Sequence, residues 1–172
     1  MRKAQIIGQV FIYALAAVVF GMILLFGYRA VDNFLQRSHE VSLIDLKNDM
    51  QSGINSIGSS KDVEKRVFYL PSKYTKLCFL GNVTDDNYKQ TTCLCLGKPG
   101  CVGGNESDYS PALCKIWRDG TRQNVYLIPL GDIDITVKKI EMEHDYLCVT
   151  PQKGMVELRL KGKGDSTLIQ KW

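Results

Sequence analysis

Proline is absent from the first 70 residues, and charged side chains are absent between residues 6 and 28. Without proline, no residue before Pro71 removes a helical hydrogen bond or forces a kink. The uncharged stretch IIGQVFIYALAAVVFGMILLFGY has 23 residues, and Gln9 is its only strongly polar one. A helix of this length reaches about 34 Å, enough to cross a hydrocarbon core roughly 30 Å thick. The sequence therefore predicts a membrane-spanning helix over residues 6–28.

Histidine, the residue that most often acts as a general acid or base, is also scarce. His39 and His144 are the only two, and neither has a cysteine or serine nucleophile at a recognisable spacing. The segment 162–164, Gly-Lys-Gly, lacks the first glycine and the following Ser or Thr of a phosphate loop, and it reads as a hairpin turn. The acidic segments 85–87 and 132–134 lack the spacing of a calcium loop. We therefore expect no catalytic residues, no metal site and no cofactor.

The charge balance excludes another class of function. The net charge is +4, from 22 basic and 18 acidic residues, and Arg2 and Lys3 supply two of the positive charges. A nucleic-acid-binding domain needs a basic patch or stripe, which this composition does not provide. No nucleic-acid partner is expected, and the length allows one ordinary domain besides the anchor.

Cysteine is missing from the N-terminal part and concentrated beyond it. The six cysteines are Cys78, Cys93, Cys95, Cys101, Cys114 and Cys148. An even number in an exported segment favours disulfides over cytosolic thiols. A zinc site is the alternative, but C-x-C followed by a cysteine after five residues does not fit the usual paired spacing of its ligands.

The pairing of these cysteines stays open among fifteen formal combinations. Cys93 and Cys95 are two residues apart, so on a strand they would point to the same face and would not bond to each other. Cys101 and Cys114 are their nearer candidates, and Cys78 with Cys148 would form a longer link.

The orientation in the membrane is not decided by the basic residues alone. Arg2 and Lys3 precede the span while Arg29 and Arg37 follow it, which is a tie. The cysteines favour an oxidising exterior for the C-terminal part. Two glycosylation sequons, which begin at Asn82 and Asn105, favour the same side. We therefore expect a single-pass protein of the cell membrane with its C-terminal domain outside.

The helical pattern continues beyond the span, from residue 29 to 57. An apolar stripe begins with Val31, Phe34 and Leu35 and continues at steps of three and four through Leu43, Leu46, Met50, Ile54 and Ile57. Gly58 is a natural C-terminal cap. A continuous helix over residues 5–57 would be about 80 Å long. Either the following domain or neighbouring subunits must cover its stripe.

Strand patterns replace the helical one after Gly58. The expected strands cover residues 66–70, 76–80, 91–96, 124–128, 133–142, 146–150, 155–161 and 167–170, and 155–161 shows the cleanest alternation. The predicted fold class is therefore α+β, with a long N-terminal helix and a small antiparallel β-rich head stapled by disulfides. Its parts are a basic leader or cytoplasmic tail (1–4), the helix (5–58) and an extracellular domain (59–172).

Three residues inside the apolar stretch point to association between helices. Ala17 and Gly21 form a small-xxx-small pair that lets two helices approach closely. Gln9 lies about one turn inside the span, where its amide is able to bond to a neighbouring chain or to lie near the interface.

The N-terminal region resembles a known family. A short basic leader ending in Lys3-Ala4, an uncharged helix starting at Gln5, an amphipathic continuation and a β-rich head resemble an archaeal type IV pilin-like protein. The leader is similar to the archaeal class III signal peptide, which implies cleavage between Ala4 and Gln5. The resemblance covers residues 1–57 by pattern, and the head only in being β-rich. Many members carry a glutamate at the fifth mature position, which Gln9 occupies here.

These observations lead to two functional expectations. The first is a structural, non-enzymatic subunit of an extracellular pilus-like filament, in which residues 6–28 pack against copies of themselves and the head faces outward. The second is a single-pass membrane protein whose extracellular domain binds a ligand or belongs to a surface complex. No group of residues supports an exported enzyme.

Overall fold

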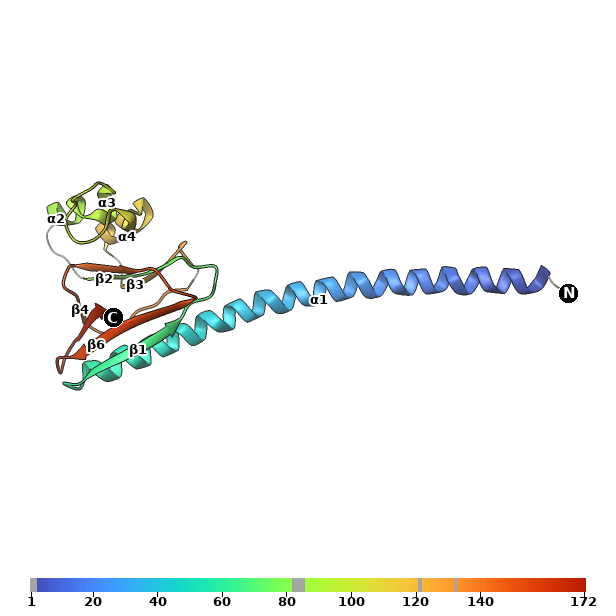
Figure 1. Ribbon diagram of the computed structural model, residues 1–172, viewed down its shortest axis with the longest axis horizontal. Coiled ribbons are helices and arrows are strands. Elements are labelled where there is room, and N and C mark those ends of the chain that lie inside the picture. The colour runs from blue at the N-terminus through green and yellow to red at the C-terminus, as the bar shows by residue number, and fades with distance from the viewer. Residues whose placement is uncertain (1–2, 82–85, 121, 132) are drawn as a thin grey trace. The chain divides into compact units, whose positions relative to one another are not determined.

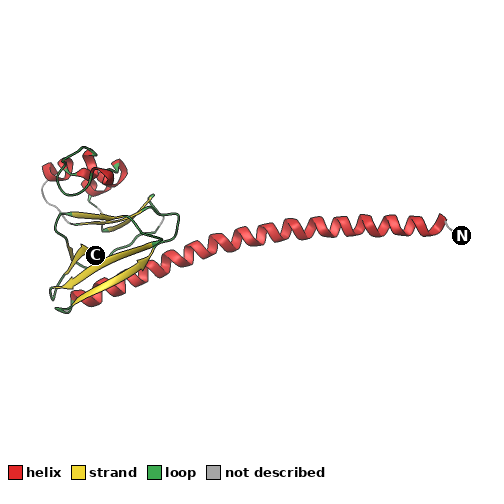
Figure 2. Ribbon diagram, viewed as in Figure 1, coloured by secondary structure: helices red, strands yellow, loops and turns green. Residues whose placement is uncertain are grey.

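The computed structural model describes residues 3–81, 86–120, 122–131 and 133–172, without the side chains of residues 3–9, 36, 39, 86 and 88. It begins with one helix, α1, which runs from Lys3 to Gly58 (Figures 1 and 2). The chain divides into two compact units, residues 1–41 and 42–172, so the last turns of α1 belong to the second unit. The predicted long N-terminal helix is confirmed.

The second unit contains two β-sheets. The four-stranded sheet has the order β1-β6-β7-β4, and the three-stranded sheet has the order β3-β2-β5. The strands are β1 (Val63–Tyr69), β2 (Lys76–Leu80), β3 (Val125–Ile128), β4 (Ile140–Glu141), β5 (Tyr146–Val149), β6 (Met155–Gly162) and β7 (Thr167–Lys171). All pairs are antiparallel except β4 with β7, which is parallel. The predicted α+β class is therefore correct.

The C-terminal turns of α1 belong to the main hydrophobic core. Leu46, Met50, Ile54 and Ile57 are at most 6% exposed and pack with inward residues of both sheets. Leu43 is partly buried against the same core. Burial of this stripe supplies the hydrophobic free energy that holds the helix end on the domain. This part of the stripe is covered by the following domain, one of the two expected solutions.

The three-stranded sheet is buried on both faces. In β2, Leu77 and Phe79 join the core shared with α1, while Cys78 and Leu80 join a second core. The second core is closed by short helices, which lie across this sheet in Figure 1. These are α2 (Asp86–Thr91), α3 (Cys93–Leu96), the 3₁₀ turn η1 (Glu106–Asp108) and α4 (Pro111–Asp119). Burial on both sides explains why β2 has a continuous apolar sequence rather than an alternating one.

The strand predicted over residues 91–96 is wrong, because these residues close α2 and form α3. Side chains two apart on a helix point about 200° away from each other, whereas on a strand they share a face. Cys93 and Cys95 therefore reach partners on different sides. The helix ends at Gly97, whose φ of 58° is left-handed.

Most of the strand predicted over residues 133–142 is also absent. Only Ile140–Glu141 is a strand, together with one isolated bridge between Ile135 and Val125. Side-chain amides take the place of a strand ladder: Asn124 exchanges two hydrogen bonds, of 2.9 and 3.0 Å, with the backbone of Val137. Helix α1 also contacts this segment, because the Gln51 amide donates a hydrogen bond of 2.8 Å to the Thr136 carbonyl.

The remaining strand predictions agree with the structure to within a few residues. The expected range 76–80 coincides with β2, and 155–161 falls inside β6. In β6 every second side chain is buried, from Val156 to Leu160, and those between are exposed. A two-residue period with one buried face is a strong signal, and it is the reason these strands are readable from sequence.

Candidate functional site

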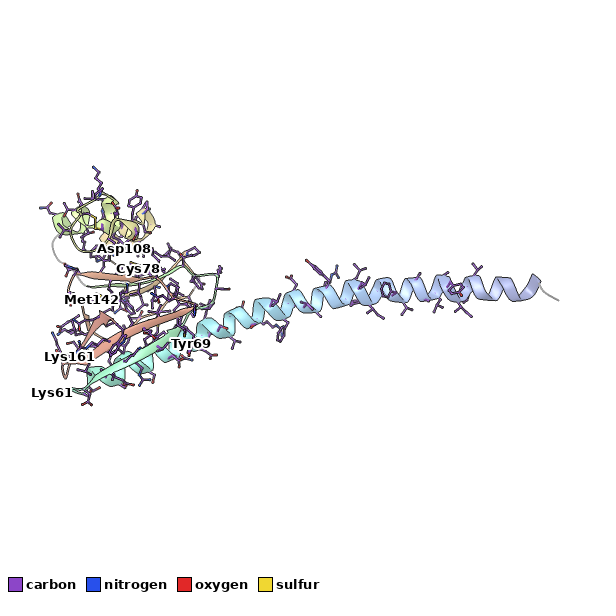
Figure 3. All side chains as sticks on the ribbon, in the orientation of Figure 1. Lys61, Tyr69, Cys78, Asp108, Met142 and Lys161 are labelled. Atoms are coloured by element: carbon purple, nitrogen blue, oxygen red, sulfur yellow. A yellow bond between two sulfur atoms is a disulfide. The ribbon has the colours of Figure 1, made fainter. Side chains whose placement is uncertain are left out.

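The first unit presents an apolar helix surface without cover from the described chain. Large apolar side chains are exposed on consecutive residues from Val10 to Tyr13 and from Met22 to Phe26, and Tyr28 reaches 77% exposure. These positions lie around the whole helix circumference, as the sticks in Figure 3 show. A helix that is apolar all round requires lipid or other apolar helices about it. This stretch is long and apolar enough to cross a membrane.

Ala17 and Gly21 lie one turn apart on this surface. Ala17 is exposed, and apart from the adjacent backbone of the helix itself and the two neighbouring residues, no described atom lies within 4 Å of a Cβ placed on Gly21. The backbone is therefore accessible at Gly21, the condition for close approach of a second helix. Gln9, Ala4 and Gln5 belong to the backbone of α1, but their side chains lie outside the described residues.

The amphipathic stripe divides into covered and uncovered parts. Leu46 and the following stripe residues are buried in the domain core. Val31, Phe34 and Leu35 are 53–72% exposed. The head thus covers the C-terminal part of the stripe, and the part in the first unit is available to a partner.

All six cysteines are paired in the structure. The disulfides join Cys78 to Cys148, Cys93 to Cys101 and Cys95 to Cys114, with sequence separations of 70, 8 and 19. Each is one of the combinations that the sequence left open. Because no cysteine remains free, thiolate ligands for zinc are not available in this state.

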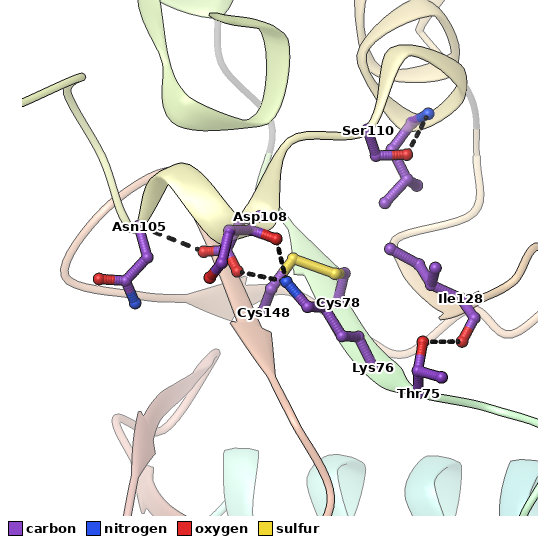
Figure 4. Close-up of a disulfide and its surroundings, with 10 residues drawn as sticks. Thr75, Lys76, Cys78, Asn105, Asp108, Ser110, Ile128 and Cys148 are labelled. Carbon is purple, nitrogen blue, oxygen red and sulfur yellow. Dashed lines mark hydrogen bonds and ion pairs between the residues drawn. A yellow bond between two sulfur atoms is a disulfide. The ribbon is translucent and has the colours of Figure 1, made fainter. Parts of the chain in front are cut away.

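The bond between Cys78 and Cys148 has a polar neighbour that fixes the η1 turn (Figure 4). The ammonium group of Lys76 in β2 forms a 3.2 Å ion pair with Asp108 and donates a hydrogen bond to the Ser107 carbonyl. Asp108 also accepts from the backbone N–H of Asn105 at 3.3 Å. Asp108 is only 6% exposed, so these donors compensate for the burial of its charge.

The two sequons differ in what the structure describes. Asn105 is exposed at the start of η1, where a glycan would have access to it. Asn82 lies outside the described residues. His144 is exposed in a bend before β5.

A cluster of opposite charges holds the β4–β7 edge. Lys139 pairs with Asp165 at 3.0 Å, and Lys163 donates to Glu141. Hydrogen bonds from Lys163 and Ser166 lower the pKa of Glu141. The hydrogen bond with Lys139 lowers the pKa of Asp165, and the same bond raises the pKa of Lys139. The cluster ties β4 and the residue before it to the turn between β6 and β7 through ion pairs and hydrogen bonds, so it stabilises this edge of the sheet.

No family model, curated protein or solved structure matches this chain. The interpretation of the site therefore depends on its geometry.

The sequence did carry a signal for α4 that the strand-based reading missed. Ser110 is the N-cap and accepts a 3.3 Å hydrogen bond from the Leu113 N–H, and Pro111 occupies the first turn. Ser followed by Pro before an apolar segment is a typical helix start. In contrast, no local pattern marks Gln51 or Asn124 as backbone partners of residues 136–137, because those contacts depend on the tertiary fold.

Proposed function

We propose that this protein is a structural subunit of an extracellular pilus-like filament. The observation that supports it best is the exposure of the apolar half of α1 on every side, from Val10 to Tyr28. In water such a surface is strongly unfavourable, at roughly 25 cal/mol for each Å² of apolar area. Copies of the same helix, packed side by side, would remove it from water as effectively as lipid does.

The two halves of α1 have separate roles in this proposal. Before assembly, the residues of the apolar half hold the subunit in the cell membrane. After assembly, Ala17 and Gly21 let neighbouring helices approach, and the exposed residues Val31, Phe34 and Leu35 extend the contact beyond the former span. The buried end of α1 keeps the head attached throughout.

The head is built for an oxidising exterior in this proposal. Three disulfides cross-link the second unit, and the exposed Asn105 is a candidate for glycosylation, as is Asn82. Disulfides stabilise mainly by restricting the unfolded chain, a useful property for a domain that remains outside the cell.

Isolation of surface filaments from cells that make the protein tests the proposal. We expect this chain to be a major component of sheared filaments, with a mature N-terminus at Gln5 by mass spectrometry. Recovery of dispersed, detergent-soluble monomer alone would contradict it.

The second candidate is a single-pass membrane protein whose head binds a ligand or a surface complex. The helix is long enough for a permanent anchor, which favours this alternative. A retained Met1 on the membrane-extracted protein, together with the absence of filaments, would support it over the filament.

A further inference from the structure

Strand β1 has an open edge. It is the first strand in the order β1-β6-β7-β4, and β6 is its only partner strand among the residues that the structure describes. Its seven residues, Val63–Tyr69, pair one by one with β6, without a bulge or a proline. Natural proteins usually shield such an edge with bulges, prolines, lysines or a covering segment, because an open edge is a template for another strand.

Two hydrogen bonds show which backbone groups point to this edge. The Gly162 N–H donates 2.9 Å to the Asp62 carbonyl, and the Leu70 N–H donates 2.8 Å to the Gly154 carbonyl. Opposed residues of an antiparallel pair alternate between bonded and non-bonded positions, so every second residue from Asp62 to Leu70 bonds to β6. The residues between them direct their N–H and C=O groups to the open edge, and these are Val63, Lys65, Val67 and Tyr69.

The side chains of these four residues do not block a second strand. The three apolar ones are 36–69% exposed. The ammonium group of Lys65 pairs with Glu157 of β6 at 2.9 Å and lies 4.9 Å from the centre of the Trp172 ring. Both contacts draw Lys65 back over the sheet and away from the edge, where a lysine would otherwise hinder pairing.

A second copy of β1 fits this edge. In an antiparallel pair centred on Lys65, the bonded positions place Val63 opposite Val67 and Lys65 opposite its own copy. This arrangement uses the outward backbone groups of both strands and forms about six main-chain hydrogen bonds.

The charges of β1 select this register. With Lys65 at the centre, Glu64 of each copy lies opposite Arg66 of the other, at the closer non-bonded positions where opposite charges stabilise a pair. Moving the centre by one residue would place two Arg66 or two Glu64 side chains opposite each other. Within one chain the two residues form a 2.7 Å ion pair at 42% exposure, so pairing of two copies would join them in a network of four alternating charges.

We propose that β1 pairs with the β1 of a second copy of this chain, in the antiparallel register centred on Lys65. Strand β1 runs back along the last turns of α1 (Figure 1), and the Phe68 ring lies 3.8 Å from a Cβ placed on Gly53. Two-fold pairing therefore sets the last turns of the two α1 helices in opposite directions. The contact joins heads that approach from facing surfaces, and it is independent of the filament proposal.

Vesicle tethering tests the proposal, because α1 helices associate within one bilayer whereas β1 strands pair between facing bilayers. The full chain is reconstituted in two vesicle populations with different lipid dyes, and cleavage by added protease confirms that heads lie outside. We expect vesicle pairs that carry both dyes, seen by two-colour microscopy, at chain densities where protein-free vesicles stay single. Absence of tethering by the parent chain would overturn the proposal.

Exchange of charges tests the register. Glu64→Arg and Arg66→Glu each place like charges opposite one another, so each variant alone should need at least about tenfold more chain per vesicle to tether. Mixing one population of each variant restores opposite charges and should restore tethering. Glu106→Arg and Arg118→Glu are the matched controls, because both residues are exposed and lie outside β1. They should tether like the parent, alone and mixed.

A proline tests the backbone contact. Val67→Pro removes an N–H that points to the open edge and leaves the bonds to β6 intact, a position where strands tolerate proline. It should weaken tethering about tenfold with an unchanged urea midpoint. Val67→Thr, which keeps the N–H, is its control.

Two further results would overturn the proposal. In one, mixed Glu64→Arg and Arg66→Glu vesicles tether as weakly as either variant alone. In the other, folded Val67→Pro tethers like the parent. The charge exchange decides the question if the proline variant does not fold. Filament formation is measured separately on cells, so failure of this proposal leaves the proposed function untouched.

Discussion

The Thr167 hydroxyl donates a 2.8 Å hydrogen bond to the Ile54 carbonyl, across 113 residues of sequence. Thr167 opens β7 and is 1% exposed, and Ile54 lies in the last turns of α1 with no exposed surface. The bond therefore joins the last strand of the head to the helix that begins the chain. Both residues are buried, so the loss of this bond is not readily compensated by solvent.

Replacing Thr167 with valine keeps the side-chain shape and removes the donor. We expect the free energy of unfolding of the head to fall by about 1–2 kcal/mol, since a buried acceptor loses its partner. Urea unfolding followed by tryptophan fluorescence in detergent measures the change. The exposed Thr150→Val variant should stay within about 0.5 kcal/mol of the parent. Equal effects of the two variants would show that the Ile54 contact contributes nothing.

Gly162 and Gly53 should respond to alanine with opposite signs. A Cβ on Gly162 would overlap the carbonyl oxygens of Ile57 and Ser60, which are backbone atoms and cannot rotate away. Gly162→Ala should therefore lower the free energy of unfolding by about 3 kcal/mol or more. A Cβ on Gly53 would lie 3.8 Å from the Phe68 ring, an ordinary contact. Gly53→Ala should raise the free energy of unfolding by at most about 1 kcal/mol, because alanine has a higher helix propensity than glycine. Thermal melting of both variants gives the comparison.

Removing different disulfides should lower the free energy of unfolding by different amounts. Cys78–Cys148 closes a separation of 70 residues and Cys93–Cys101 one of 8. Loop-closure entropy predicts losses of about 4.4 and about 2.5 kcal/mol for the paired alanine replacements. Denaturant unfolding of the two double variants measures both values. A larger loss for the shorter loop would show that packing of the sulfur atoms, and not chain entropy, dominates.

The charge cluster at the β4–β7 edge makes the stability of the head depend on pH. The pKa values of Glu141 and Asp165 are lowered in the folded state, so their contribution is present above the ordinary carboxylate range near pH 4 and is lost on acidification. The raised pKa of Lys139 adds a contribution that is present below its ordinary range, near pH 10, and is lost above it. The parent should lose more stability than Glu141→Gln between about pH 5 and pH 2.

Unfolding measured across this pH range, at low salt and in 1 M NaCl, checks the prediction. The difference between parent and variant should shrink in high salt because the cluster is exposed. Glu106→Gln provides the control, since Glu106 is exposed and forms no ion pair with any described residue. A salt-independent difference would assign the effect to packing.

Gly21→Leu should weaken association of the apolar helix. The new side chain would cover the accessible backbone between Ala17 and Gly21, and we expect self-association in lipid to weaken about tenfold, or roughly 1.4 kcal/mol. Energy transfer between labelled copies in vesicles measures it. Gly27 has equally open surroundings but lies on another face, so Gly27→Leu is the matched control. Equal losses would argue against a specific face.

Periodicity decided which parts of the fold could be predicted from the sequence. The stripe from Leu46 to Ile57 and the alternation in β6 each have one buried face, so their residue types repeat with the geometry. Residues 91–96 have β-forming side chains, yet they are helical, with a left-handed C-cap at Gly97 and disulfides at Cys93 and Cys95. Residues 133–139 resemble a strand, but amides of Gln51, Asn55 and Asn124 bind their backbone. Local composition does not indicate such long-range partners.

For the candidate site, the apolar surface and the cysteine set were evident from the sequence, and the pairing was not. The pocket lined by Lys89, Arg122 and Lys139 was not evident either, because these residues are far apart in the chain and none belongs to a motif. The tertiary fold brings them together, since Lys89 lies in α2, Arg122 follows α4 and Lys139 precedes β4.

Cys78 and Cys148 face each other directly in the antiparallel register of β2 with β5. A slip of one residue between these strands would exchange the two faces of β2 and turn Cys78 toward the main core, away from Cys148. Oxidation of this pair therefore reports that the strands have aligned correctly. In an oxidising compartment, this disulfide would form only in heads whose strands are correctly paired and would then lock that register. Heads with misaligned strands would keep free thiols at Cys78 and Cys148 and could still rearrange.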